Sequence, residues 1–255
     1  MTTLMRHPLV VFALSFLVMW ASAWTGTRLR QMRRIVDDAE REDLRTIQGA
    51  ALTLLALLIG FTFSMSVGRY DQRKNYEEEE ANAIGTEYVR ADLLQAADAA
   101  RLHQLLKAYA DKRVLYYTTT DEHQLQQINT STSALQHDLW STIRSPVTAQ
   151  PSPITALLAS GMNDVLNSQG YTQAAWRNRI PTAAWLLMII IAIACSAMVG
   201  YNTHQLAGKF RLVFILPAIV AVSFFLIADM ESPRRGVIRV GPENLMDVAN
   251  SMQGQ

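Results

Sequence analysis

The hydrophobic and polar residues of this chain are sorted into long blocks. Four windows contain no Asp, Glu, Lys or Arg; they are Pro8 to Thr27, Ile47 to Val67, Pro181 to Tyr201 and Leu212 to Ala228. The ~30 Å hydrocarbon core of a bilayer needs about 20 helical residues. Because three windows reach that length and the fourth is only slightly shorter, the pattern predicts four transmembrane helices.

The first window admits a second interpretation. Arg6 and His7 precede its apolar run, which ends in Ala21-Ser22-Ala23, the order found in a secretory signal peptide. The run is long for the apolar part of such a peptide. A membrane-spanning helix is therefore the preferred interpretation.

The segment between the second and third windows is polar overall but has helical periodicity. Its apolar residues recur at intervals of three, four and seven, namely Ile84, Tyr88, Ala91, Leu94, Leu102, Leu105, Tyr109 and Tyr116. This stripe predicts one long helix that continues the second span into water.

Capping signals divide the rest of that segment. Thr119 with Glu122 forms a capping box, which predicts a second helix that ends by Ser145-Pro146. Ser152 as N-cap, with Pro153 at the first helical position, predicts a third helix. The expected fold is therefore all-α, with four transmembrane helices and a helical extramembrane domain between the second and third spans.

The expected organisation has four parts. Residues 1–67 hold the first two spans with a short charged loop, 68–180 the extramembrane domain, 181–230 the last two spans and 231–255 a polar C-terminal tail. Four spans place both termini and the domain on one face. Lys and Arg near the span ends number nine on that face and eight on the other. The positive-inside rule therefore does not choose the cytoplasmic face.

Charge and motifs narrow the possible functions. The formal net charge of +1 gives no reason to expect a nucleic-acid partner. The five histidines show no metal-ligand spacing, and there is no phosphate-binding loop, nucleophile elbow or zinc-protease helix. We therefore expect no enzyme activity, no metal and no cofactor, and the spans make membrane lipid a partner.

Small and hydroxyl residues are concentrated at the end of the second window, from Gly60 to Gly68. Small residues allow close helix packing, and hydroxyls can bond across helices or line a wet path. The residues alone leave both interpretations open. Shortly after them, the run Glu77 to Glu80 could set the field near a pore mouth. Four consecutive residues wrap around a helix, however, so at most two face any one partner, and Arg73 and Lys74 lie one turn back as partners, which favours a structural role.

These residues resemble the bestrophin family of anion channels, and more closely the bacterial bestrophin-like membrane proteins. Gly60-Phe61 followed by Arg69-Tyr70 is similar to the family pattern at the end of the second span. The segment from Asp229 to Val240 resembles the motif that follows the last span. The residues that carry this motif resemblance are Arg69, Tyr70, Asp229, Glu231 and Pro233.

The resemblance implies a homo-oligomer, a pentamer in bestrophins, whose second spans surround a path for small ions such as chloride. The pore-lining residues that it implies are Thr53, Leu57, Gly60, Phe61 and Ser64. An apolar neck of this kind can gate by dewetting. We place Leu54 on another face of the helix. The resemblance also implies a multi-pass protein of the bacterial inner (cytoplasmic) membrane, with both termini and the large domain in the cytosol.

The acidic calcium clasp of animal bestrophins is reduced here to Asp229 and Glu231. Calcium prefers six to eight oxygen ligands, so we expect no calcium dependence. The rival function is a membrane sensor or scaffold protein without conduction.

Overall fold

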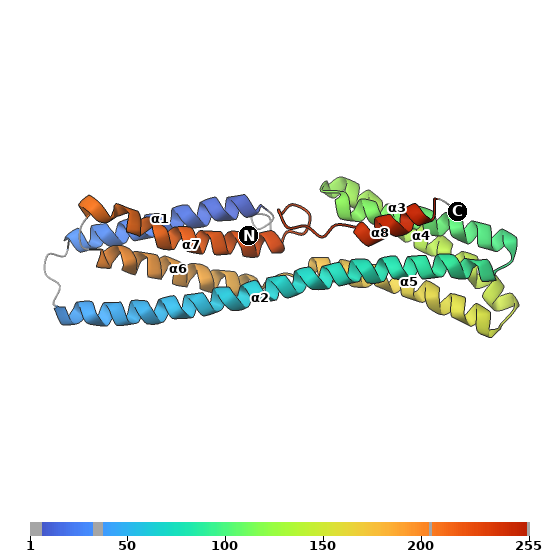
Figure 1. Cartoon of the computed structure of the whole chain (residues 1–255), viewed down its shortest axis with the longest axis horizontal. Helices are drawn as coiled ribbons and strands as arrows, with labels where there is room; N and C mark the ends of the chain where they lie inside the picture. Colours follow the sequence, from blue (N-terminus) through green and yellow to red (C-terminus); the bar gives the residue numbers. More distant parts are fainter. Residues whose placement is uncertain (1–6, 33–37, 204–205, 254–255) are drawn as a thin grey trace. The chain divides into compact units, whose positions relative to one another are not determined.

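The computed structural model of the chain describes residues 7–32, 38–203 and 206–253, and its regular structure is helical (Figure 1). The elements are α1 (Pro8–Met32), α2 (Asp38–Arg90), the 3-10 helix η2 (Ala91–Leu93), α3 (Ala96–Thr118), α4 (Glu122–Ala149), α5 (Pro153–Arg177), α6 (Thr182–Asn202), α7 (Leu206–Met230) and α8 (Glu243–Ser251). They form two compact units. The membrane unit comprises Met1–Arg69 and Arg179–Arg239, and the helical unit comprises Tyr70–Asn178 and Val240–Gln255.

Four helical stretches are long and apolar enough to cross a membrane, and they lie in α1, α2, α6 and α7. The prediction of an all-α protein with four transmembrane helices is confirmed. Helices are required here because a chain in hydrocarbon must satisfy its backbone polar groups within the segment. α1 packs against both α6 and α7, and the three lie side by side in Figure 1.

A pair of glycines sets the crossing of α1 and α6. Gly26 lies against the carbonyl of Ala197, and Gly200 lies against the carbonyl of Ala23, so a Cβ at either glycine would overlap the facing backbone. In lipid, helices associate through close packing of this kind, since the tails around them are equally apolar. The glycine pair therefore holds α1 in the bundle.

We predict that Gly200→Ala lowers the thermal unfolding midpoint of the purified protein in detergent. The added methyl group must push α1 away, and overpacking of this kind costs about 1–3 kcal/mol. Gly49→Ala is the matched control, because a Cβ at Gly49 meets open space. It should leave the midpoint unchanged or raise it slightly, since alanine favours helix. Equal midpoints for the two variants would contradict the close crossing.

The helical unit confirms that the second span continues as a helix beyond the membrane, but the single long helix predicted through Tyr116 is wrong. α2 ends at Arg90, and the backbone at Leu94 and Gln95 is extended before α3 begins. α3 then folds back on α2, and the ring of His103 stacks on Tyr88 with 4.2 Å between centroids. Folding back buries an apolar side of α3 that one straight helix would leave in water.

Two predicted helix ends also differ from the structure. α4 begins after Asp121 instead of Thr119, because the Asp121 carboxylate accepts the amide protons of His123 and Gln124 at 2.7 and 3.3 Å. α4 also passes Pro146 and ends at Ala149. Proline removes one hydrogen bond and is tolerated here because only the last turn follows it.

The predicted start of α5 is confirmed. Ser152 caps the helix in a reciprocal capping box with Thr155, and Pro153 occupies the first turn. The C-terminal segment, for which the sequence indicated no helix, contains α8. Val248 of α8 lies in van der Waals reach of Gly85 on α2, at 3.6 Å from the position of a Cβ. The last residues are thus part of the helical unit.

Candidate functional site

One side of α2 in the membrane unit is exposed along its whole length. Its residues include all the predicted pore-lining positions, Thr53, Leu57, Gly60, Phe61 and Ser64. Phe61 is 67% exposed and Leu57 is 54% exposed, so neither side chain packs closely against the chain's own helices. The opposite side, with Leu55, Thr62 and Ser66, is buried. The five predicted residues therefore share one unpartnered face, which we call the α2 outer face.

Leu54 belongs to the same exposed side, so its assignment to another face is wrong. It is 49% exposed and precedes Phe61 by seven residues. Seven residues make about two full turns at 3.6 residues per turn, so the two side chains point almost the same way. Leu54 therefore lies on the α2 outer face in line with Phe61, about two turns away.

The α2 outer face differs chemically from the exposed faces of α6 and α7. On α6 and α7 the large exposed residues are branched and aliphatic, such as Leu187, Ile190 and Ile219. The α2 outer face instead mixes Leu57 and Phe61 with small and hydroxyl residues. A face that contacts only lipid tails has no need of exposed glycine, threonine and serine.

The sequence left open whether the hydroxyls of α2 serve helix packing or line a wet path, and these hydroxyls differ in burial. Thr62 and Ser66 are buried, and they donate to the carbonyls of Leu58 and Thr62 at 2.6 and 3.0 Å. These two residues are packing residues. Thr53 and Ser64 are exposed, and a Cβ at Gly60 would meet open space, so none of the three packs against the chain's own helices.

The motif residues at the end of the membrane unit connect its segments. Glu231, which follows α7, accepts a hydrogen bond from Nη1 of Arg69 at 3.4 Å and one from the backbone N–H of Ile180 at 2.9 Å. One carboxylate thus joins α2, at the last residue of its part in the membrane unit, to the end of α7 and to Ile180, which lies just before α6. Tyr70 lies in the other unit, where it packs against the apolar core.

Asp229 shapes the turn that follows α7. Its two carboxylate oxygens accept the backbone N–H groups of Val237 and Ile238 at 2.7 and 2.8 Å. Gly236 is required beside it, since a Cβ there would lie 2.7 Å from the Asp229 carbonyl oxygen. Pro233 is buried in the same turn.

Both acidic residues of the motif therefore have structural partners in the chain itself. The described residues contain no group of three or more His, Cys, Asp or Glu side chains able to hold a metal ion. A carboxylate whose two oxygens each already accept a protein donor is a poorer calcium ligand, because calcium needs six to eight oxygens. The expectation that calcium plays no part here stays a prediction.

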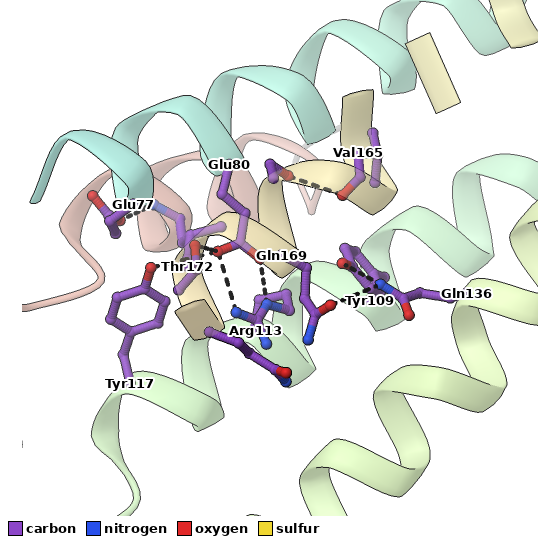
Figure 2. Close-up of polar contacts among 12 residues, drawn as sticks. Glu77, Glu80, Tyr109, Arg113, Tyr117, Gln136, Val165, Gln169 and Thr172 are labelled. Atoms are coloured by element: carbon purple, nitrogen blue, oxygen red, sulfur yellow. Dashed lines mark hydrogen bonds and ion pairs between the residues drawn. The ribbon is translucent and has the colours of Figure 1, made fainter. Parts of the chain in front are cut away.

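The acidic run on α2 is not a uniformly solvated surface. Glu78 and Glu79 are exposed, whereas Glu77 and Glu80 are buried in the helical unit. Figure 2 shows Glu80 at the centre of a polar cluster. Its carboxylate accepts hydrogen bonds from both Nε and Nη2 of Arg113, from the hydroxyl of Thr172 at 3.0 Å and from that of Tyr117 at 3.4 Å.

The Glu80 cluster joins three helices, because Glu80 lies on α2, Arg113 and Tyr117 on α3, and Thr172 on α5. Burial acts to lower the pKa of Arg113, but the Glu80 carboxylate beside it raises the pKa above its ordinary value. Burial and the charge of Glu80 raise the pKa of Tyr117, which keeps the phenol protonated as a donor. The centre of the cluster is therefore a fully enclosed ion pair.

Glu77 attaches the C-terminal helix. Its carboxylate accepts the side-chain amide of Asn244 at 2.6 Å and the backbone N–H of Leu245 at 2.9 Å. A carboxylate at a helix N-terminus satisfies free N–H groups and complements the helix dipole. Burial raises the pKa of Glu77, while these hydrogen bonds act in the opposite direction. These partners lie far along the chain, and no sequence pattern indicated them.

We predict that Arg113→Met strongly destabilises the helical unit. The change leaves Glu80 buried without its cation, and breaking a buried ion pair in this way costs about 3–5 kcal/mol. Arg101→Met makes the same substitution at an exposed position of α3 and should change stability by less than about 0.5 kcal/mol. Chemical denaturation of both variants measures the difference. A loss of stability no larger in Arg113→Met than in Arg101→Met would mean that Glu80 is not enclosed.

The geometry defines a multi-pass, all-helical membrane protein with a second helical unit. A family model described as the Bestrophin-like domain matches residues 10–245, and the chain belongs to the bestrophin-like family. This confirms the resemblance stated from the motif residues. No curated protein matches the chain.

The fold is shared with solved structures of a bacterial bestrophin homologue from Klebsiella pneumoniae. One such structure has a TM-score of 0.69 at 15% sequence identity, covering 97% of this chain and 98% of that chain. A single-residue variant of the homologue gives a TM-score of 0.71 at 13% identity, with 97% and 98% coverage. At such low identity the likeness establishes the fold alone.

Proposed function

We propose that this protein is a homo-oligomeric passive ion channel for anions such as chloride, with the α2 helices of its subunits around a central path. Membership of the bestrophin-like family supports the class of protein. The observation that carries the proposal is the α2 outer face, which is long, exposed and mixed in chemistry. Copies of α2 arranged about an axis would give this face its partners.

Subunit number and orientation follow the resemblance. We propose a pentamer in the bacterial inner membrane, with both termini and the helical unit in the cytosol. The charges near the span ends do not decide the orientation, so this part of the proposal depends on the family alone. Membrane lipid would then cover the aliphatic exposed faces of α6 and α7, and the protein would need no cofactor and perform no enzymatic step.

The narrowest ring in this arrangement is formed by Phe61, with Leu57 and Thr53 one and two turns away on the same face. The Thr53 hydroxyl donates to the carbonyl of Gly49 at 3.0 Å, so it adds little free polarity to the ring. An apolar ring disfavours hydrated ions, because polar groups that lose water unpaired cost several kcal/mol. Such a ring gates by dewetting and selects weakly among ions.

We predict that Phe61→Ala raises halide flux through reconstituted liposomes by roughly tenfold or more. A tenfold change needs only about 1.4 kcal/mol less barrier, and removing an aromatic ring from every subunit widens and wets the constriction. Leu54→Ala, on the same face but two turns from the proposed ring, should raise the flux less. The measurement is halide efflux at equal protein-to-lipid ratio.

Ile190→Ala is the control, since it also truncates an exposed apolar side chain in a span, but on α6. It should leave the flux at the wild-type level. If wild type and all variants were equally silent while the oligomers stayed intact, the scaffold or sensor function would replace the channel. If Ile190→Ala opened the path and Phe61→Ala did not, α2 would not line it.

A further inference from the structure

Glu87 is a buried carboxylate that none of the clusters described above uses. It lies on α2 in the helical unit, and its side chain is fully enclosed. Neither of its carboxylate oxygens has a hydrogen-bond partner among the described residues. Nη1 of Arg90, one turn further along α2, is 3.7 Å from Oε2, which is an ion-pair distance too long for a good hydrogen bond. Burying an unsatisfied carboxylate is costly, so this position needs an explanation.

Gly161 on α5 makes this burial possible. A Cβ at Gly161 would overlap both Oε2 of Glu87 and Nη1 of Arg90. The neighbours of Gly161 on the same side of α5 are the buried apolar residues Leu158 and Met162. The glycine therefore lets the backbone of α5 close directly over the carboxyl group, and apolar surface surrounds the contact.

The charged groups that act on Glu87 come from both helices. Burial raises the pKa of Glu87 to about 7, Arg90 on its own helix acts to lower it, and Asp164 on α5 acts to raise it further. Glu80 differs in this respect, since it has a bidentate arginine and two hydroxyl donors. Glu87 lacks such donors, and its enclosed site favours the neutral form.

We propose that Glu87 and Gly161 form a proton-dependent contact between α2 and α5, in which the neutral carboxyl permits the close packing of the two helices and its ionisation loosens it. Ionisation releases the proton to solvent and leaves a charge that needs water or a donor, which the closed contact does not supply. α5 must then move from α2 to admit water. This inference is independent of conduction, because it concerns packing within the helical unit alone.

The direction of the pH effect follows from linkage. The folded protein binds the Glu87 proton more tightly than the unfolded chain, whose ordinary pKa is 4.5. Stability from this contact is therefore fully present below about pH 4.5 and is lost as the pH rises to about 7. The corresponding difference in proton affinity is on the order of a hundredfold.

Two measurements on the full-length protein in detergent test the contact. Difference infrared spectroscopy should record a protonated carboxyl band that disappears near pH 7 and is missing in Glu87→Gln. Thermal unfolding midpoints should show Glu87→Gln more stable than the wild type at pH 8 by roughly 5 °C or more, since the amide stays neutral. Glu79→Gln, at an exposed position of the same helix, is the matched control and should follow the wild type at every pH.

Asp164→Asn keeps the test decisive should Glu87→Gln fold poorly, because Asp164 is exposed. Removing its negative charge should move the midpoint of the infrared titration to lower pH. The proposal is overturned if no carboxyl band titrates near neutral pH in the wild type. It is equally overturned if Glu87→Gln folds and retains the band, or if Asp164→Asn leaves the midpoint unchanged.

Discussion

The structure depends on one constraint, that a chain inside hydrocarbon must hydrogen-bond its own backbone. This constraint turns the four charge-free windows into helices and leaves their side chains to decide which sides meet. α1 and α6 meet through close backbone contact at Gly26 and Gly200, and α1 also packs against α7. α2 contributes only a narrow buried stripe to this bundle, and its remaining surface is the α2 outer face. Because the described helices leave the α2 outer face exposed, that face supports the proposed channel.

In the membrane unit close backbone packing holds helices together, and in the helical unit buried charged groups do so. The buried side of α2 carries three carboxylates, Glu77, Glu80 and Glu87, at helical spacing. The cost of burying the carboxylate is compensated differently in each case. Glu80 has a bidentate arginine, Glu77 has the N-terminus of α8, and Glu87 has no hydrogen-bond donor among the described residues and favours its neutral form. The first two fix helices to α2, and the third makes the packing of α5 depend on protonation.

The sequence predicted the parts of the fold that local chemistry determines. Charge-free windows gave the four spans, and Ser152 with Pro153 gave the start of α5, because these signals lie within a few residues of the structure they specify. The break between α2 and α3 could not be predicted, since the apolar periodicity continues through it. Packing decides that break, when α3 folds back and His103 stacks on Tyr88.

In the candidate site, too, features set by nearby residues could be predicted and those set by distant residues could not. Helical periodicity and the family motif together placed Thr53, Leu57 and Phe61 on one face, while the partners of Glu80 were not foreseen. Arg113 and Thr172 are 33 and 92 residues away from Glu80, and nothing local connects them. Pairing with Arg73 and Lys74 was the structural role expected for the acidic run, whereas two of its four residues are buried against distant partners. Long-range polar pairs of this kind become visible only in three dimensions.

The central claim is that α2 presents its outer face to the same face of other copies around an axis. An image of the purified protein in a lipid disc, at a resolution that separates helices and large side chains, tests it most directly. The account predicts a closed ring of subunits with α2 innermost and the Phe61 rings at the narrowest point of a continuous axial path. A ring with another helix innermost, or a single chain whose α2 outer face contacts lipid, would contradict it.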